Sequence, residues 1–155
     1  MITVEPVAWV RSSRREPIDD DWDTVEASIE LADSLETSAL DGVEEFSHAE
    51  VIFFLDQVPA SAIQRGTRHP RGNTAWRAVG IFAQRGRARP NRLGLTTVRI
   101  LGRKGRVLSV SGLDAVDGTP VLDIKPVMVE FLPREPVRQP AWSAELMRQY
   151  WKKSE

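Results

Sequence analysis

Three arginines stand at alternate positions in the segment QRGRARPNRLG, residues 84–94: Arg85, Arg87 and Arg89. Alternate residues of an extended chain share one face, so these guanidinium groups would form a row of forked donors that suits carboxylate or phosphate. Asn91 and the turn at Gly94 follow, and they could bring backbone amides to a ligand. A solvated cationic edge that protects a strand from aggregation explains the same row, and both interpretations stay open.

A second segment with charged and turn-forming residues is SGLDAVDGTPVLDIKPV, residues 111–127. Asp117 and Gly118 predict a turn typical of a hairpin, and Pro120 stiffens the entry into the strand that follows. Asp123 points away from its apolar neighbours because side chains alternate along a strand. Its carboxylate could hold a ligand amine or hydroxyl, or it could pair with one of the arginines.

Several kinds of chemistry find no support in the sequence. The two histidines, His48 and His69, stand in no metal-binding spacing, and there is no GxSxG elbow. We therefore expect no metal, and the sequence identifies no catalytic residue. A GxGxxG turn and a GxxxxGK[ST] loop are also missing, which argues against a Rossmann cofactor domain and a P-loop.

Composition indicates one soluble domain. The chain has 155 residues, of which 41% are hydrophobic, and this is enough to bury a single core. It has no cysteine, so no disulfide framework is available and an intracellular protein is the simplest interpretation. No apolar run approaches the length of a membrane span, and the start does not resemble a signal peptide. We expect a cytoplasmic protein.

The net charge of −1 conceals a strong segregation along the chain. Residues 16–56 contain fourteen acidic side chains and no Lys or Arg, whereas residues 57–113 contain eleven Arg, one Lys and no acid. Either the two blocks face each other in the fold, or the basic block forms a surface for a polyanion such as RNA. Both interpretations can hold together.

The elements that would position these residues are mostly strands. Alternating or continuous apolar runs predict strands at Ile2–Val10, Thr24–Leu31, Ala49–Leu55, Trp76–Ala83, Leu95–Gly102, Arg106–Leu113 and Pro120–Lys125. A short helix or a pair of turns is expected near residues 32–48, and residues 59–73 are expected to form a long exposed loop. A C-terminal helix over about 140–152 carries an aromatic stripe that packs on the barrel or on a partner subunit, with a stacking platform as the alternative. The fold class is mainly β: a closed or nearly closed β-barrel with a few short helices.

Three motifs together resemble a known family. EEFSHAEVIFFLDQ (44–57), FAQRGRARPNRLGLTTV (82–98) and LDAVDGTPVLDIKP (113–126) are similar to the TsaA-like family, also called YaeB-like or TrmO-like. The resemblance runs from about Val4 to Pro126. It implies one TsaA-like domain over 1–155 with a core at about 4–132, a homodimer, and S-adenosylmethionine bound near the subunit interface.

The resemblance also implies which residues form the site. The family's cofactor contacts would fall on Asp56, Gln57, Arg85, Leu95, Val121, Leu122, Asp123 and Ile124. Candidates for the acceptor side are Arg87, Arg89, Asn91, Asp117 and Lys125. The segment PIDDDWD, residues 17–23, stands where relatives often contact the cofactor, and Trp22 could stack on a cofactor or a base.

The activity that the resemblance implies is S-adenosylmethionine-dependent methylation. The expected acceptor is the exocyclic nitrogen of threonylcarbamoyl-adenosine in tRNA, or a related group. Methyl transfer from a sulfonium needs alignment and desolvation more than a strong base, which agrees with a site without a catalytic triad. The alternative is a non-catalytic module that binds S-adenosylmethionine or RNA.

Overall fold

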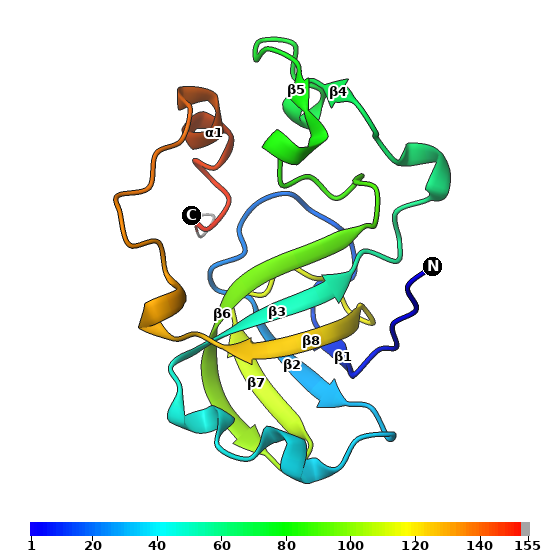
Figure 1. Ribbon diagram of the computed structural model, residues 1–155, viewed down its shortest axis with the longest axis vertical. Helices are drawn as coiled ribbons and strands as arrows, with labels where there is room; N and C mark the ends of the chain where they lie inside the picture. Colours follow the sequence, from blue (N-terminus) through cyan, green and yellow to red (C-terminus); the bar gives the residue numbers. More distant parts are fainter. Residues whose placement is uncertain (153–155) are drawn as a thin grey trace.

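Six strands form a closed barrel in the computed structural model of the chain, which describes residues 1–152 (Figure 1). Their order around the barrel is β1-β2-β7-β6-β3-β8, and all neighbours are antiparallel. The strands are β1 (Ala8–Ser12), β2 (Glu26–Leu31), β3 (His48–Phe54), β6 (Leu93–Lys104), β7 (Val107–Ser111) and β8 (Pro120–Pro126). The predicted mainly β barrel is confirmed.

Alternation of apolar side chains fills the barrel. Along β3, the side chains of Ala49, Val51 and Phe53 are buried, while those between them lie on the outer surface. The Phe53 ring lies against Gly94 of β6, where an added Cβ would come within 2.3 Å of the ring. Gly94 therefore permits a core aromatic side chain, and not a ligand, to approach its backbone closely.

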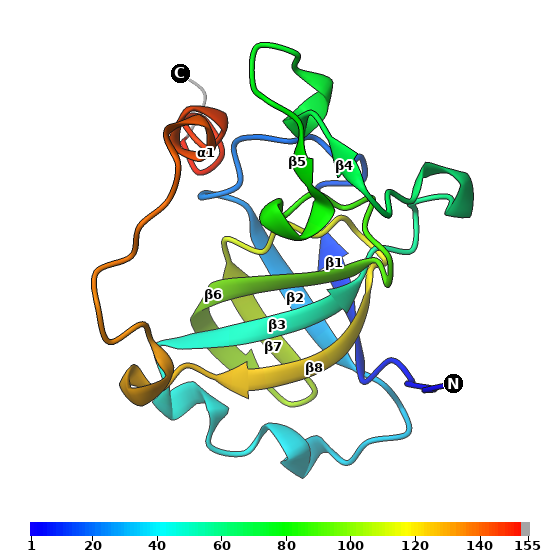
Figure 2. The ribbon, with the colours of Figure 1, turned by 45° about the horizontal axis from the view of Figure 1, so that its top comes forward.

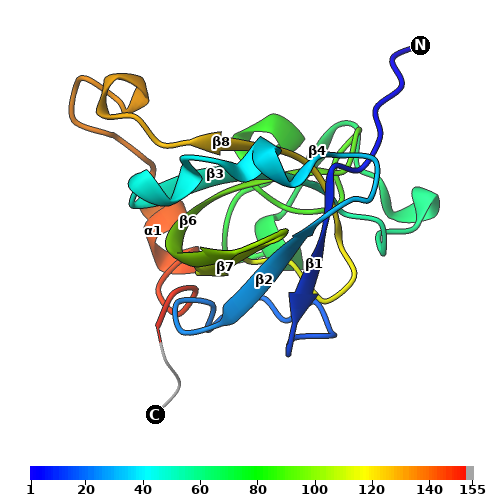
Figure 3. The same ribbon diagram turned by 90° about the horizontal axis from the view of Figure 1, so that it is seen from below.

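The lower end of the barrel is closed by two 3-10 turns, η1 (Thr37–Leu40) and η2 (Val43–Glu45). Gly42 connects them with φ of 88°, a left-handed conformation that favours glycine. Figure 3 views the barrel from the end that these turns cover. The turns confirm the prediction of short helical turns near residues 32–48.

The upper end carries three long connections, which we call the upper loops: residues 13–25, 55–92 and 112–119 (Figure 2). They hold short elements, namely η3 (Ala60–Ala62), β4 (Thr67–Arg68), η4 (Pro70–Gly72), β5 (Val79–Gly80) and η5 (Ile81–Ala83). β4 and β5 form a separate two-stranded sheet above the barrel.

The chain leaves β8 through η6 (Val129–Phe131) and an exposed arm, and then forms α1 (Ala141–Leu146) beside the upper loops (Figure 1). The predicted helix over 140–152 is shorter than expected, because residues 147–151 continue as turns and a bend. We call residues 141–152 the C-terminal cap. No helix among the described residues is long and apolar enough to cross a membrane.

Four further predictions were wrong in detail. The first strand begins at Ala8, and most of the predicted strand Trp76–Ala83 is loop and 3-10 turn. The predicted loop at 59–73 contains η3, β4 and η4. The Asp117-Gly118 turn exists, since Thr119 N–H donates to the Val116 carbonyl at 3.2 Å, but it does not form a hairpin. β7 pairs with β2 and β6, whereas β8 pairs with β1 and β3, so the segment between β7 and β8 crosses the upper end of the barrel.

Candidate functional site

The residues expected to contact the cofactor lie on or beside three neighbouring strands, β6, β3 and β8. Ile52 in the middle strand pairs with Leu95 on one side and with Asp123 on the other, and this places the two on the same outer face. Arg85 reaches this face from the upper loops, where its Nη2 donates to the Leu95 carbonyl at 2.5 Å. Leu95 is 46% exposed, so an apolar surface stays open beside the arginine.

Asp56 and Gln57 lie at the upper end of the same face. They follow β3 after Leu55, and both are exposed. The last residue of β3, Phe54, pairs with Leu93, two residues before Leu95 on β6. The structure therefore brings the predicted residues of two separate motifs to one end of two paired strands.

The predicted residues on β8 differ in what they can offer. The Val121 side chain is completely buried, and its carbonyl accepts the Val7 N–H at 2.8 Å. Leu122 lies where the pairing with β3 shifts register. Asp123 pairs with Lys125 at 3.3 Å and also accepts the Ile124 N–H at 2.9 Å. Asp123 thus forms its ion pair with a lysine of the same strand, and not with one of the arginines as the sequence analysis considered.

A cavity of about 400 Å³ follows one edge of β8 toward the lower end. β1 pairs with β8 only at Pro120 and Val121, and the cavity lies beyond the end of that pairing. β8 contributes Asp123, Ile124 and Pro126, and the 3-10 turns contribute apolar side chains such as those of Leu40 and Val43. The backbone edge of β8 thus borders a space that could receive a flat ligand.

The three alternating arginines contact three different partners. Arg85 contacts β6, Arg87 Nη1 donates to the Pro17 carbonyl at 2.9 Å, and Arg89 Nη1 donates to the Gln84 carbonyl at 2.8 Å. Arg89 therefore stabilises its own loop. These residues do not form the single row that the alternation predicts, because residues 85–92 form turns and irregular backbone before β6 begins.

The remaining acceptor-side candidates are spread around the barrel. Asn91 is exposed in the turn before β6, and Lys125 is exposed on β8 beside Asp123. Asp117 accepts the Ser12 N–H at 3.0 Å and lines a second, polar cavity of about 420 Å³ on the outer side of β1, β2 and β7. The fold does not bring Asp117 and Lys125 to a common point with Arg87.

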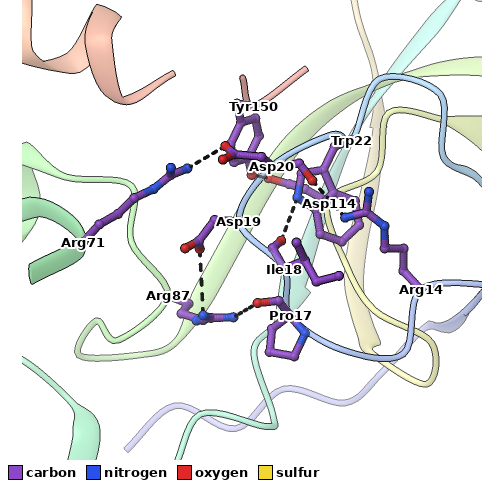
Figure 4. A network of polar contacts seen from close by, with 10 residues as sticks. All are labelled: Arg14, Pro17, Ile18, Asp19, Asp20, Trp22, Arg71, Arg87, Asp114 and Tyr150. Carbon is purple, nitrogen blue, oxygen red and sulfur yellow. Dashed lines mark hydrogen bonds and ion pairs between the residues drawn. The ribbon is translucent and has the colours of Figure 1, made fainter. Parts of the chain in front are cut away.

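The acidic loop folds back onto the basic block (Figure 4). Asp20 forms an ion pair with Arg71 at 3.1 Å, and Asp19 lies 3.9 Å from Arg87. This confirms that the acidic and basic blocks face each other.

Trp22 is not available to stack on a ligand. Its side chain is 3% exposed, its Nε1 donates to the Ile18 carbonyl at 3.1 Å, and the Arg14 guanidinium lies 4.4 Å from the ring centroid. The expected stacking role is wrong because the indole ring packs inside its own loop.

Two residues that the sequence alone did not single out meet at the mouth of the barrel. The Asp114 carboxylate accepts a hydrogen bond from the Thr96 hydroxyl. It also accepts one from the phenol of Tyr150, a residue of the C-terminal cap that Figure 4 draws beside Asp114. Burial raises the pKa of Tyr150 well above its ordinary value, and the neighbouring Asp114 raises it further, while Arg85 and Arg71 lower it. Asp114 belongs to the motif LDAVDG, but no local pattern pointed to a tyrosine 36 residues away.

The histidines have local partners. His48 Nδ1 lies 2.7 Å from the Ser47 hydroxyl, and His69 Nδ1 lies 2.7 Å from the Trp76 carbonyl within the upper loops. Within residues 1–152 no group of three or more histidine or acidic side chains is placed to hold a metal ion.

Residues 11–131 match the family model described as the tRNA-methyltransferase O N-terminal domain. The chain belongs to this family. The resemblance noted in the sequence motifs is confirmed, and the match covers every predicted site residue. It ends before the C-terminal cap.

Individual relatives agree with this assignment. The chain is 34% identical over 148 residues to a probable S-adenosyl-L-methionine-binding protein of Pyrococcus abyssi, a match that covers 89% of this chain and 74% of the relative. It is 38% identical over 93 residues to the tRNA (adenine(37)-N6)-methyltransferase of Mus musculus, covering 60% of this chain and 21% of that enzyme. The crystal structure of TrmO from P. aeruginosa superposes with a TM-score of 0.74 at 29% identity, covering 93% of this chain and 62% of TrmO.

Proposed function

We propose that the chain binds S-adenosylmethionine and transfers its methyl group to the exocyclic nitrogen of threonylcarbamoyl-adenosine in tRNA. The observation that carries the proposal is the register of β6, β3 and β8, which places Leu95 and Asp123 on either side of Ile52, with Arg85 bound to the same surface. The names of the mouse enzyme and of TrmO support the tRNA acceptor, and the name of the archaeal relative supports the cofactor.

The residues present fit the parts of this cofactor. The exposed Arg85 guanidinium uses one nitrogen for the Leu95 carbonyl, and its remaining N–H donors suit the methionine carboxylate. Leu95 would cover an apolar part of the ligand. The edge of β8 beyond Val121, together with the exposed Asp56 and Gln57, would contact the adenosine part.

The chemistry follows from positioning. When bound, the cofactor supplies an activated methyl group on a positively charged sulfur. The residues of the chain would hold the two reactants in line and exclude water while the sulfur–methyl bond breaks and the nitrogen–methyl bond forms, which leaves a neutral thioether. The proton of the exocyclic N–H would pass to solvent after the transfer, so neither role requires a strong base. This agrees with a site in which arginine, leucine and backbone groups predominate.

A homodimer with the cofactor site near the subunit interface, in the cytoplasm, belongs to the same proposal. Support comes from the outer face of β6, where Leu93 is 44% and Leu95 is 46% exposed. Two half-exposed leucines at the proposed site suit burial against a second subunit.

Cofactor binding and methyl transfer can be tested separately. We expect calorimetry to detect S-adenosylmethionine binding, and we expect Arg85→Ala to weaken it about tenfold through loss of a charged hydrogen bond. Arg65→Ala is the matched control, because this arginine is exposed in the same upper loops and is not a predicted contact. Transfer of labelled methyl to tRNA supports the enzyme, whereas binding without transfer to any RNA supports the non-catalytic module. Absence of cofactor binding would contradict both.

A further inference from the structure

The Asp114 carboxylate lies at the mouth of the barrel, next to the proposed cofactor site. One of its oxygens accepts the hydroxyl of Thr96, which is 6% exposed and follows Leu95 directly on β6. The other oxygen accepts the Tyr150 phenol. The carboxylate is thus held by the barrel on one side and covered by an aromatic donor on the other.

Among the described residues, few hydrogen bonds attach the segment that supplies Tyr150 to the upper loops. No residue of α1 is buried, and residues 128–141 are exposed throughout. The cap is held by the Tyr150 bond, by backbone bonds from Asp21 and Trp22 to the carbonyls of Gln149 and Tyr150, and by Trp76 Nε1 to Glu145 at 2.8 Å. A segment with little buried apolar surface opens more readily than the barrel.

The positive charges around the phenol connect this place to the proposed cofactor site. Arg85, which binds β6 at Leu95, lowers the pKa of Tyr150, as does Arg71 from the upper loops. The phenol is therefore within electrostatic reach of the arginine assigned to the cofactor carboxylate.

We propose that Asp114 binds the N–H of the nucleobase that accepts the methyl group, and that Tyr150 occupies the position of this base in the free chain. This inference rests on the proposed function. A phenol is an aromatic ring that presents one hydrogen-bond donor, and an adenine derivative with an exocyclic N–H presents the same combination. The acceptor would displace the cap and bind to the oxygen of Asp114 that Tyr150 leaves.

Displacement of the cap can be followed directly, because Tyr150 is the single tyrosine of the chain. Incorporation of 3-fluorotyrosine gives the protein one ¹⁹F signal. We expect tRNA that carries threonylcarbamoyl-adenosine to move this signal toward that of free 3-fluorotyrosine, and we expect S-adenosylmethionine alone not to do so. An unmoved signal in labelled protein that methylates the same tRNA overturns the inference and leaves the proposed function standing.

Two variants test the competition. Tyr150→Phe keeps the ring and loses the donor, so the acceptor competes with a weaker occupant, and we expect the KM for tRNA to fall about tenfold at unchanged kcat. Asp114→Asn should raise that KM about tenfold. Both variants should bind S-adenosylmethionine as the parent chain does.

Ser143→Ala is the control within the cap, since its hydroxyl donates to the Pro140 carbonyl and accepts from the Gln139 side chain, and neither residue belongs to the barrel. It should leave the KM for tRNA unchanged. If Tyr150 were merely structural, Tyr150→Phe would lower the melting temperature with an unchanged or raised KM, and that result overturns the inference. A parent chain that binds S-adenosylmethionine but methylates no tRNA overturns both the proposed acceptor and the inference.

Discussion

The barrel and the upper loops are held together by different interactions. In the barrel, strand pairing satisfies the backbone and alternating apolar side chains fill the interior. In the upper loops, arginine side chains donate to backbone carbonyls, as Arg14 does to Asp20, Arg87 to Pro17 and Arg92 to Val58. Arginine suits this role because its planar guanidinium carries five donors, which satisfy carbonyls that no strand partner reaches.

This difference changes the meaning of the basic block. Twelve cations without an acid in residues 57–113 left two interpretations open when the sequence was considered alone, a surface for RNA or a partner for the acidic block. In the fold, several of these arginines bind carbonyls or acidic side chains of the chain itself. The positive charge left for a polyanion is therefore smaller than the composition suggests.

The strongest test of the barrel side of this comparison is Gly94→Ala. The new Cβ would lie 2.3 Å from the Phe53 ring in the core, so the ring or the strand must move, and we expect a loss of about 3 kcal/mol in the free energy of unfolding. Gly102→Ala on the same strand is the control, because a Cβ there meets nothing within 4 Å. Denaturant unfolding measures both variants. If Gly94→Ala and Gly102→Ala had equal free energies of unfolding, the packing of Phe53 against Gly94 would not be tight.

The same contrast explains what could be predicted from the sequence. The strands of the barrel can be predicted from apolar alternation, because alternate side chains of a barrel strand face the interior and the outer surface. The region Trp76–Ala83 has similar composition, but only Val79 and Gly80 form a strand there. Its conformation depends instead on contacts such as Gln84 Nε2 to the Arg68 carbonyl, which connect distant residues and leave no periodic signal.

Alkaline titration tests the interactions above the barrel. At neutral pH, Tyr150→Phe removes a hydrogen bond to a carboxylate, and we expect a loss of about 1.5 kcal/mol in stability. The raised pKa of Tyr150 keeps the phenol protonated in the native chain, while in the unfolded chain it ionises near pH 10. The unfolded state then binds fewer protons, so this contribution is complete below about pH 10 and is lost as pH rises further.

The measurement is the difference in the free energy of unfolding between the parent chain and Tyr150→Phe as a function of pH. Other titrating groups are common to both proteins and cancel in the difference. We expect the parent to lose its advantage above about pH 10. A difference that stays constant through pH 11 would contradict a buried phenol bonded to Asp114.

The candidate site likewise contains residues that the sequence motifs supplied and residues that only the fold brings together. The family motifs supplied Arg85, Leu95 and the residues of β8, but only the register of the closed barrel shows that β3 lies between β6 and β8. Asp114 and Tyr150 meet through the path of the C-terminal arm, which no spacing rule in the sequence describes. Residues that meet only through tertiary contact between distant segments were therefore the ones missed.

The smallest expected effect concerns the acidic loop. Asp19 and Arg87 lie 3.9 Å apart, and their side chains are 57% and 44% exposed, so solvent screens most of their attraction. We expect Asp19→Asn to change stability by less than about 0.5 kcal/mol, and the change should shrink further as salt is raised.

Asp20→Asn is the informative comparison, because the ion pair of Asp20 with Arg71 is shorter, at 3.1 Å, and the Asp20 side chain is 32% exposed. Thermal melting at low and high salt compares the two. If Asp19→Asn lowered the melting temperature more than Asp20→Asn, charge at the exposed edge of the acidic loop would hold this loop in place. The burial of Trp22 beneath Arg14 would then not be what fixes the position of the loop.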